Sequence, residues 1–124
     1  MNSLDQLGLE AAYQQALLAE SQDEVPVGAV LMLNEQIVAT GYNQKEQRQD
    51  VSAHAEIVCL RQASQGLDTW RLLETTLYVS LEPCVMCAGA IVHARVKRLV
   101  VGASDPKGGG ESLYQIFTNC QLNH

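Results

Sequence analysis

The chain has 124 residues, which is enough for one domain and too few for two, so we take 1–124 as a single domain. Its hydrophobic fraction of 47% predicts a folded globular protein, and its formal net charge of −6 argues against general binding to nucleic-acid phosphates. No apolar run is long enough to cross a bilayer, and the N-terminus shows no signal-peptide pattern. We therefore expect a cytoplasmic protein with no membrane partner.

The predicted elements alternate between helices and strands. Apolar residues between positions 4 and 19 recur with the period of a helix. Two strands at 27–34 and 37–43 follow, joined by a turn short enough to make a hairpin. The remaining predicted elements are a helix at 53–65 with Ser52 as its N-cap, a strand at 75–81, a helix at 84–94 with Pro83 at its start, a strand at 96–103 and a last helix at 113–120.

This order predicts an α/β fold. Two strand–helix–strand units imply a sheet with a mostly parallel ending that is covered by helices. The inner helices would begin near one rim of that sheet, where α/β folds place their binding sites.

Four polar residues stand at the starts of the two inner helices. Cys84 and Cys87 are three positions apart and share one helix face, where the positive end of the helix dipole would favour thiolate. With His54 they make a set of three zinc ligands that leaves the fourth position open for water, as in catalytic sites. Zinc would lower the pKa of that water toward about 7, and Glu56 is placed to take its proton.

Other interpretations of the same cysteines are a redox pair or a structural zinc site. A structural site needs a fourth donor close by. Cys59 lies in the apolar run "IVCL", and we expect a core residue there and a small apolar residue at Cys120. We expect a capping or core role for His93, and the role of terminal His124 is open.

The blocks "HAE" (54–56) and "PCVMC" (83–87) match the H-x-E and P-C-x-x-C signature of zinc nucleobase deaminases. Together with "VPVGAV", Asn43, "LYVSLEPCVMCAGAI" and "GASDPK", they make nearly the whole chain resemble the bacterial tRNA-specific adenosine deaminase family. The resemblance implies the three-layer α/β/α cytidine-deaminase-like fold, with a mixed five-stranded sheet and a homodimer. It also implies conversion of adenosine to inosine at the wobble position of a tRNA anticodon loop by zinc-activated water.

Carried over by position, the resemblance assigns zinc binding to His54, Cys84 and Cys87, and proton transfer to Glu56. Asn43 would hydrogen-bond the target nucleotide, and the backbone at Ala55 would face the base. Asp105 and Lys107 lie in the loop that lines the RNA groove in this family. An ordinary solvated turn around Pro106 is the alternative for these two residues.

The sequence also departs from the family pattern. Val51 replaces a usual proline, the loop at "KGGGES" is one residue short, and the chain is acidic for an RNA enzyme. It ends where the family continues into a last strand and a terminal helix, so we expect a sheet without that strand, with reduced stability and weaker RNA binding. The zinc chemistry by itself also fits a small-molecule deaminase of guanine, cytosine or nucleosides, and a zinc-bearing RNA-binding module without turnover is the alternative outside enzymes.

Overall fold

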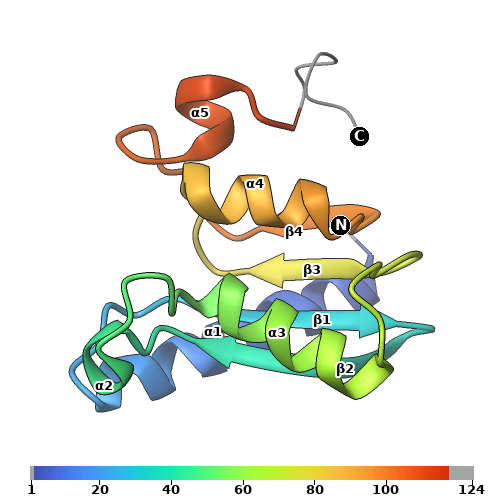
Figure 1. The fold of residues 1–124 in the computed structure, drawn as a ribbon, viewed down its shortest axis with the longest axis horizontal. Helices are drawn as coiled ribbons and strands as arrows, with labels where there is room; N and C mark the ends of the chain where they lie inside the picture. The colour runs from blue at the N-terminus through green and yellow to red at the C-terminus, as the bar shows by residue number, and fades with distance from the viewer. Residues whose placement is uncertain (1, 118–124) are drawn as a thin grey trace.

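Four strands form one mixed sheet in the order β2-β1-β3-β4 (Figure 1). This computed structural model describes residues 2–117, and its strands are β1 (Gly28–Leu33), β2 (Gln36–Tyr42), β3 (Thr76–Val79) and β4 (Arg98–Val101). β1 runs antiparallel to both β2 and β3, whereas β3 and β4 are parallel. Strands β2, β3 and β4 therefore point the same way, which confirms the expected mostly parallel ending.

Helices cover both faces of this sheet and complete the expected three layers. α1 (Ser3–Ser21) lies behind the sheet in Figure 1, and α3 (Ala55–Leu67) and α4 (Val85–His93) lie in front. Two short helices, α2 (Lys45–Arg48) and α5 (Gly110–Tyr114), flank the ends at which α3 and α4 begin. Within residues 2–117, no helix combines the length and the apolar character needed to cross a membrane.

The hairpin between β1 and β2 forms as predicted. Asn34 and Glu35 at its tip have φ angles of 53° and 66°, which are the left-handed conformations that a two-residue hairpin turn of type I′ requires. Along β1 the side chains alternate between two cores. Leu31 packs under α3 and α4, whereas Val30 packs under α1, and both are fully buried. The continuous apolar run of β1 thus reflects burial on both faces.

A buried carboxylate joins the first turn of α1 to the sheet. The Tyr78 hydroxyl donates to Asp5 Oδ1 at 2.7 Å, and the Arg98 guanidinium donates to both oxygens of Asp5 at 3.2 and 3.0 Å. The hydrogen bonds from Arg98 and Tyr78 hold the pKa of the Asp5 carboxyl below its usual range. Asp5 therefore stays ionised and links α1 to both β3 and β4.

Two local predictions need correction, and one short helix was missed. Ser52 is not the N-cap of α3, because that helix begins at Ala55 with His54 in the cap position, and the Ser52 hydroxyl donates to Asp50 Oδ1 at 2.7 Å instead. The last helix begins at Gly110 and ends at Tyr114, earlier than the predicted 113–120, and residues 118–120 lie outside the described part. The short helix α2, which has only four residues, was not predicted at all.

Close contact between α1 and β1 makes Gly28 a sensitive position. A Cβ atom there would lie 2.1 Å from the Ala12 carbonyl oxygen and 2.4 Å from the Ala16 nitrogen, and neither backbone atom can yield easily. We expect Gly28→Ala to lower the free energy of unfolding by about 3 kcal/mol, at the upper end of overpacking costs. At Gly66 in α3 a Cβ atom would meet nothing within 4 Å, so Gly66→Ala should raise the free energy of unfolding by up to about 1 kcal/mol. Urea denaturation of both variants measures the contrast, and equal midpoints would contradict it.

Candidate metal and catalytic site

The site lies where β2 and β3 end and α3 and α4 begin. β2 delivers Asn43, which is buried and is the residue directly after the strand. Asn43 Oδ1 accepts a hydrogen bond from the backbone N–H of Ala55 at 2.8 Å, so the asparagine satisfies one of the free amides at the start of α3. The side chain of His54, in the N-cap position, makes no capping hydrogen bond.

The His54 side chain points at the two cysteines of α4. Cys84 occupies the N-cap position of α4 and Cys87 lies in its first turn, fully buried. His54 Nδ1 lies 3.6 Å from Cys84 Sγ and 3.5 Å from Cys87 Sγ. Within residues 2–117 these three residues form the group suited to a metal ion, with all their ligand atoms within 4.8 Å of one another.

These distances fit a tetrahedral zinc ion. Zn–S bonds of about 2.3 Å and Zn–N bonds of about 2.0–2.1 Å at tetrahedral angles place a nitrogen and a sulfur roughly 3.6 Å apart. Burial, followed by the positive charge of Lys45, lowers the pKa of His54, and this favours the neutral imidazole that binds metals. Both the donor set and its spacing therefore match the predicted ligands.

Burial of Cys87 acts against the effect expected of the helix start. Burial, together with the nearby Glu56 and Cys84, raises the pKa of the Cys87 thiol well above its usual value. Desolvation disfavours the thiolate and so opposes the effect of the helix dipole. A bound divalent cation reverses this balance, because a coordinating thiol is deprotonated outright. A metal ion at this position would therefore supply the positive charge that stabilises the Cys87 thiolate.

Glu56 lies in the first turn of α3, with 3% of its surface exposed. Burial raises the pKa of its carboxyl to about 7, and its side chain interacts with the Cys87 thiol. Glu56 is not among the three clustered ligand residues, although it lies beside them. This arrangement leaves a carboxyl group next to the metal position with a pKa suited to taking up and releasing protons.

The other cysteine and histidine predictions have mixed outcomes. Cys59 is fully buried in the core under α3, as expected, and burial raises the pKa of its thiol to about 12. His93 is not a core residue, because it is exposed in the last turn of α4. Cys120 and His124 lie outside the described residues.

The loop predicted at 104–112 lies within the segment 103–112, which we call the 103–112 loop and which ends in the first residues of α5. Asp105 Oδ1 accepts hydrogen bonds from the backbone N–H groups of Lys107 and Gly108 at 3.2 and 3.1 Å, so this carboxylate closes its own turn. Lys107 is exposed. The backbone of Gly109 pairs with that of Cys84, which brings this loop to the metal ligands.

Sequence reasoning missed two buried carboxylates beside the site. Glu24 accepts hydrogen bonds from the backbone N–H groups of Glu46 and Gln47 at 3.2 and 2.8 Å and so holds α2. Glu82 binds the 103–112 loop in a similar way. The sequence did offer a signal for Glu82, because it is the only charged residue in the run "TTLYVSLEPCVMCAGAIV", and a lone charge among apolar residues indicates a specific partner.

Known proteins resemble this chain over most of its length. A family model described as MafB19-like deaminase matches residues 5–123. The tRNA-specific adenosine deaminase of Bacillus subtilis is 46% identical over 121 residues, which cover 97% of this chain and 75% of that protein.

Solved structures share the fold. A structure from studies of A-to-I editing by tRNA:A34 deaminases at the wobble position of transfer RNA has a TM-score of 0.92 and 45% identity, covering 96% of this chain and 92% of the other. The guanine deaminase of Bacillus subtilis has a TM-score of 0.79 and 35% identity, covering 84% and 66%. The tRNA:A34 deaminase and the guanine deaminase thus share the fold of this chain.

Proposed function

This chain belongs to the MafB19-like deaminase family, and we propose that it converts adenosine to inosine at the wobble position of a tRNA anticodon loop. The observation that carries the proposal is the cluster of His54, Cys84 and Cys87 with a buried carboxyl group, Glu56, beside it. The identity to the tRNA-specific enzymes favours adenosine in RNA over guanine, because the guanine deaminase is less similar.

We assign zinc binding to His54, Cys84 and Cys87. When bound, zinc supplies a Lewis acid that lowers the pKa of a water molecule toward about 7. Cysteine sulfur and imidazole nitrogen at the observed spacing suit zinc better than the oxygen-preferring cations.

The side chains around the metal position then transfer the proton and bind the nucleotide. Glu56 takes a proton from the attacking water and delivers it to the base, so that ammonia leaves C6 as water oxygen is added there. Asn43 keeps its Nδ2 donor for the nucleotide while its Oδ1 is held by the Ala55 N–H. Because the Ala55 N–H already donates to Asn43, we propose that the backbone of Ala55 faces the base without donating that hydrogen bond to it.

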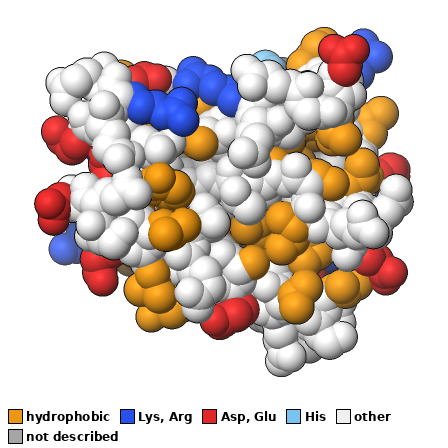
Figure 2. Space-filling view, turned by 90° about the horizontal axis from the view of Figure 1, so that it is seen from below, with side chains coloured by type: hydrophobic (Ala, Val, Ile, Leu, Met, Phe, Trp, Pro, Cys, Tyr) orange, Lys and Arg blue, Asp and Glu red, His pale blue; other side chains and the backbone are white. Residues whose placement is uncertain are grey.

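The target base has to be unpaired or flipped out, because C6 cannot be reached inside a duplex. An anticodon loop presents such bases, and Lys107 on the 103–112 loop and Lys45 on α2 lie on the two segments flanking the site. On the face shown in Figure 2, most of the Lys and Arg side chains gather in one group, whereas Asp and Glu are dispersed. We propose that positive side chains such as Lys45 and Lys107 contact the RNA locally, so that the chain can hold RNA despite its net charge of −6.

A substrate panel tests the proposal. The protein is loaded with zinc and incubated separately with a tRNA anticodon hairpin, free adenosine, cytosine and guanine. We expect inosine in the hairpin and no product from the free compounds. Guanine or cytosine turnover would instead indicate a small-molecule deaminase, and zinc binding without any product would indicate a non-catalytic module.

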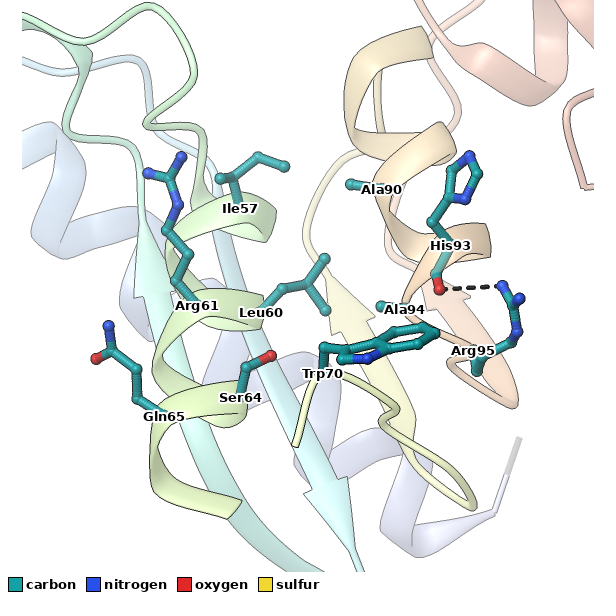
Figure 3. Close-up of a pocket in the computed structure, with 10 residues that line it drawn as sticks. All are labelled: Ile57, Leu60, Arg61, Ser64, Gln65, Trp70, Ala90, His93, Ala94 and Arg95. Carbon is teal, nitrogen blue, oxygen red and sulfur yellow. Dashed lines mark hydrogen bonds between the residues drawn. The ribbon is translucent and has the colours of Figure 1, made fainter. Parts of the chain in front are cut away.

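We also propose that the chain forms a homodimer through the outer face of α3 and α4. A pocket of about 520 Å³ lies between these helices, lined by Ile57, Leu60, Arg61, Ser64, Gln65, Trp70, Ala90, His93, Ala94 and Arg95 (Figure 3). Trp70 is 56% exposed, and its ring lies 5.0 Å from the Arg71 guanidinium and 5.8 Å from that of Arg95. A large aromatic ring beside a hollow apolar surface is typical of an interface.

Introducing a charge into this pocket should separate the protomers. Ala90 faces the pocket from α4, so Ala90→Arg places a long cation where apolar surface would be buried (Figure 3). We expect at least a tenfold weaker dimer by sedimentation equilibrium, which corresponds to about 1.4 kcal/mol. Leu7→Arg adds the same charge to exposed surface of α1 on the other face of the sheet and serves as the control. Equal dissociation constants for the two variants would contradict the interface.

A further inference from the structure

Glu82 is a buried carboxylate that the proposed chemistry does not use. It lies between β3 and the metal ligand Cys84, with 8% of its surface exposed. Its Oε1 accepts hydrogen bonds from the Asp105 N–H at 2.9 Å and from the Ser112 hydroxyl at 2.6 Å. Its Oε2 accepts the Ser112 N–H at 2.7 Å. A single side chain thus binds both ends of the 103–112 loop.

Backbone contacts extend this link. The Glu82 N–H donates to the Ala103 carbonyl oxygen at 2.8 Å, and the Gly110 N–H donates to the Pro83 carbonyl oxygen at 2.8 Å. With the pairing of Cys84 and Gly109, they join the ligand-bearing segment 82–84 to the loop along its length. The position of the loop is therefore set by the same segment that presents Cys84.

Gly109 shows how closely the loop fits the carboxylate. A Cβ atom at Gly109 would lie 2.1 Å from Glu82 Oε2, so only glycine leaves room for the backbone to pass here. At Gly108 the nearest atom to such a Cβ is Asp105 Oδ2 at 3.3 Å. At Gly110 a Cβ atom would lie 2.7 Å from Ala88 Cβ, so Gly109 and Gly110 both fit closely, and Gly109 is the one that packs against the Glu82 carboxylate.

We propose that Glu82 is a positioning residue that fixes the 103–112 loop beside the metal site, so that Asp105 and Lys107 meet the RNA in one defined arrangement. The inference rests on the proposed function, because it assigns this loop to substrate binding. Glu82 acts through the loop and touches neither the base nor the metal ligands' side chains in this role. Its loss should therefore weaken substrate binding more than the chemical step.

The test compares Glu82→Gln with Glu74→Gln. In Glu82→Gln, one of the two carboxylate oxygens that accept hydrogen bonds from the loop is replaced by an NH₂ group, which cannot accept them. Glu74 is exposed and forms a surface ion pair with Lys97 at 2.9 Å, so Glu74→Gln is the control. We expect KM for an anticodon hairpin to rise about tenfold in Glu82→Gln, in line with the loss of a charge-assisted hydrogen bond, while kcat and zinc content stay close to wild type. Amide hydrogen exchange at Asp105 and Ser112 should accelerate, and Glu74→Gln should change neither KM nor exchange.

A milder variant keeps the inference testable if Glu82→Gln does not fold. Ser112→Ala removes the hydroxyl bond to Oε1 and leaves the Ser112 N–H bond to Oε2, so we expect KM to rise by about threefold to fivefold. Unchanged KM and unchanged exchange would show that Glu82 contributes to stability alone and would overturn the proposal. Loss of zinc together with kcat would also overturn it. If the wild type makes no inosine, the proposed function fails, and the exchange at Asp105 and Ser112 still decides whether Glu82 holds the loop.

Discussion

Glu56→Ala should lower the rate of adenosine deamination by about 10²–10⁴-fold while the protein keeps its full content of zinc. The reason is that Glu56 lies beside the ligand cluster without belonging to it, so its removal takes away the proton carrier and leaves His54, Cys84 and Cys87 in place. Single-turnover kinetics on the anticodon hairpin and metal analysis of the same sample measure the two quantities together.

Glu56→Gln provides a nearly isosteric version of this test. It preserves the packing of the buried side chain but cannot carry a proton at neutral pH, so it should lose as much activity as Glu56→Ala. Glu10→Ala, on the exposed surface of α1, is the matched control and should retain full activity. If Glu56→Ala lost its zinc, Glu56 would be a ligand, and the assignment of an open coordination position would be wrong.

Cys87→Ala should abolish both zinc binding and activity. The two donors that remain, His54 and Cys84, cannot by themselves complete a catalytic zinc site. Cys59→Ala is a closely matched control, because Cys59 is equally buried and its thiol is also hard to ionise, but it lies outside the ligand cluster. We expect Cys59→Ala to bind zinc as the wild type does.

Thermal unfolding with and without a chelator gives an independent measure of the same effect. A ligand that binds only the folded state stabilises it by an amount that grows with the logarithm of the ligand concentration relative to Kd, so the melting temperature of the wild type should fall when zinc is removed. Cys87→Ala should melt at the same temperature in either condition, and Cys59→Ala should respond like the wild type. A chelator response in Cys87→Ala equal to that of the wild type would contradict the ligand assignment.

The sequence was sufficient to predict the ligand cluster because its members occupy defined local positions. His54 and Cys84 precede helices, and Cys87 follows one turn later, so two helix starts at the same rim of a sheet bring them together. The alternation of β1 and the hairpin at Asn34–Glu35 were predictable for the same reason, since both depend on residues close in sequence. Local patterns therefore sufficed to predict the cluster of candidate metal ligands and the order of the elements.

What the sequence could not reveal depends on contacts between distant segments. α2 has only four residues, and Glu24, more than twenty positions before it, accepts two of its backbone amides. Asn43 replaces the expected Ser52 as the partner of the first amide of α3 for a similar reason. The raised pKa of Cys87 likewise follows first from burial in the assembled core, which depends on contacts between distant segments.

The most direct measurement of the central claim is the fate of water oxygen in the product. A zinc-loaded sample is given the anticodon hairpin in water enriched in the heavy oxygen isotope, and the digested nucleosides are analysed by mass spectrometry. The account predicts inosine at the wobble position with the heavy isotope at C6 in the wild type, and unchanged adenosine in Glu56→Ala. An intact hairpin in the wild-type reaction, or inosine without the heavy isotope, would contradict it.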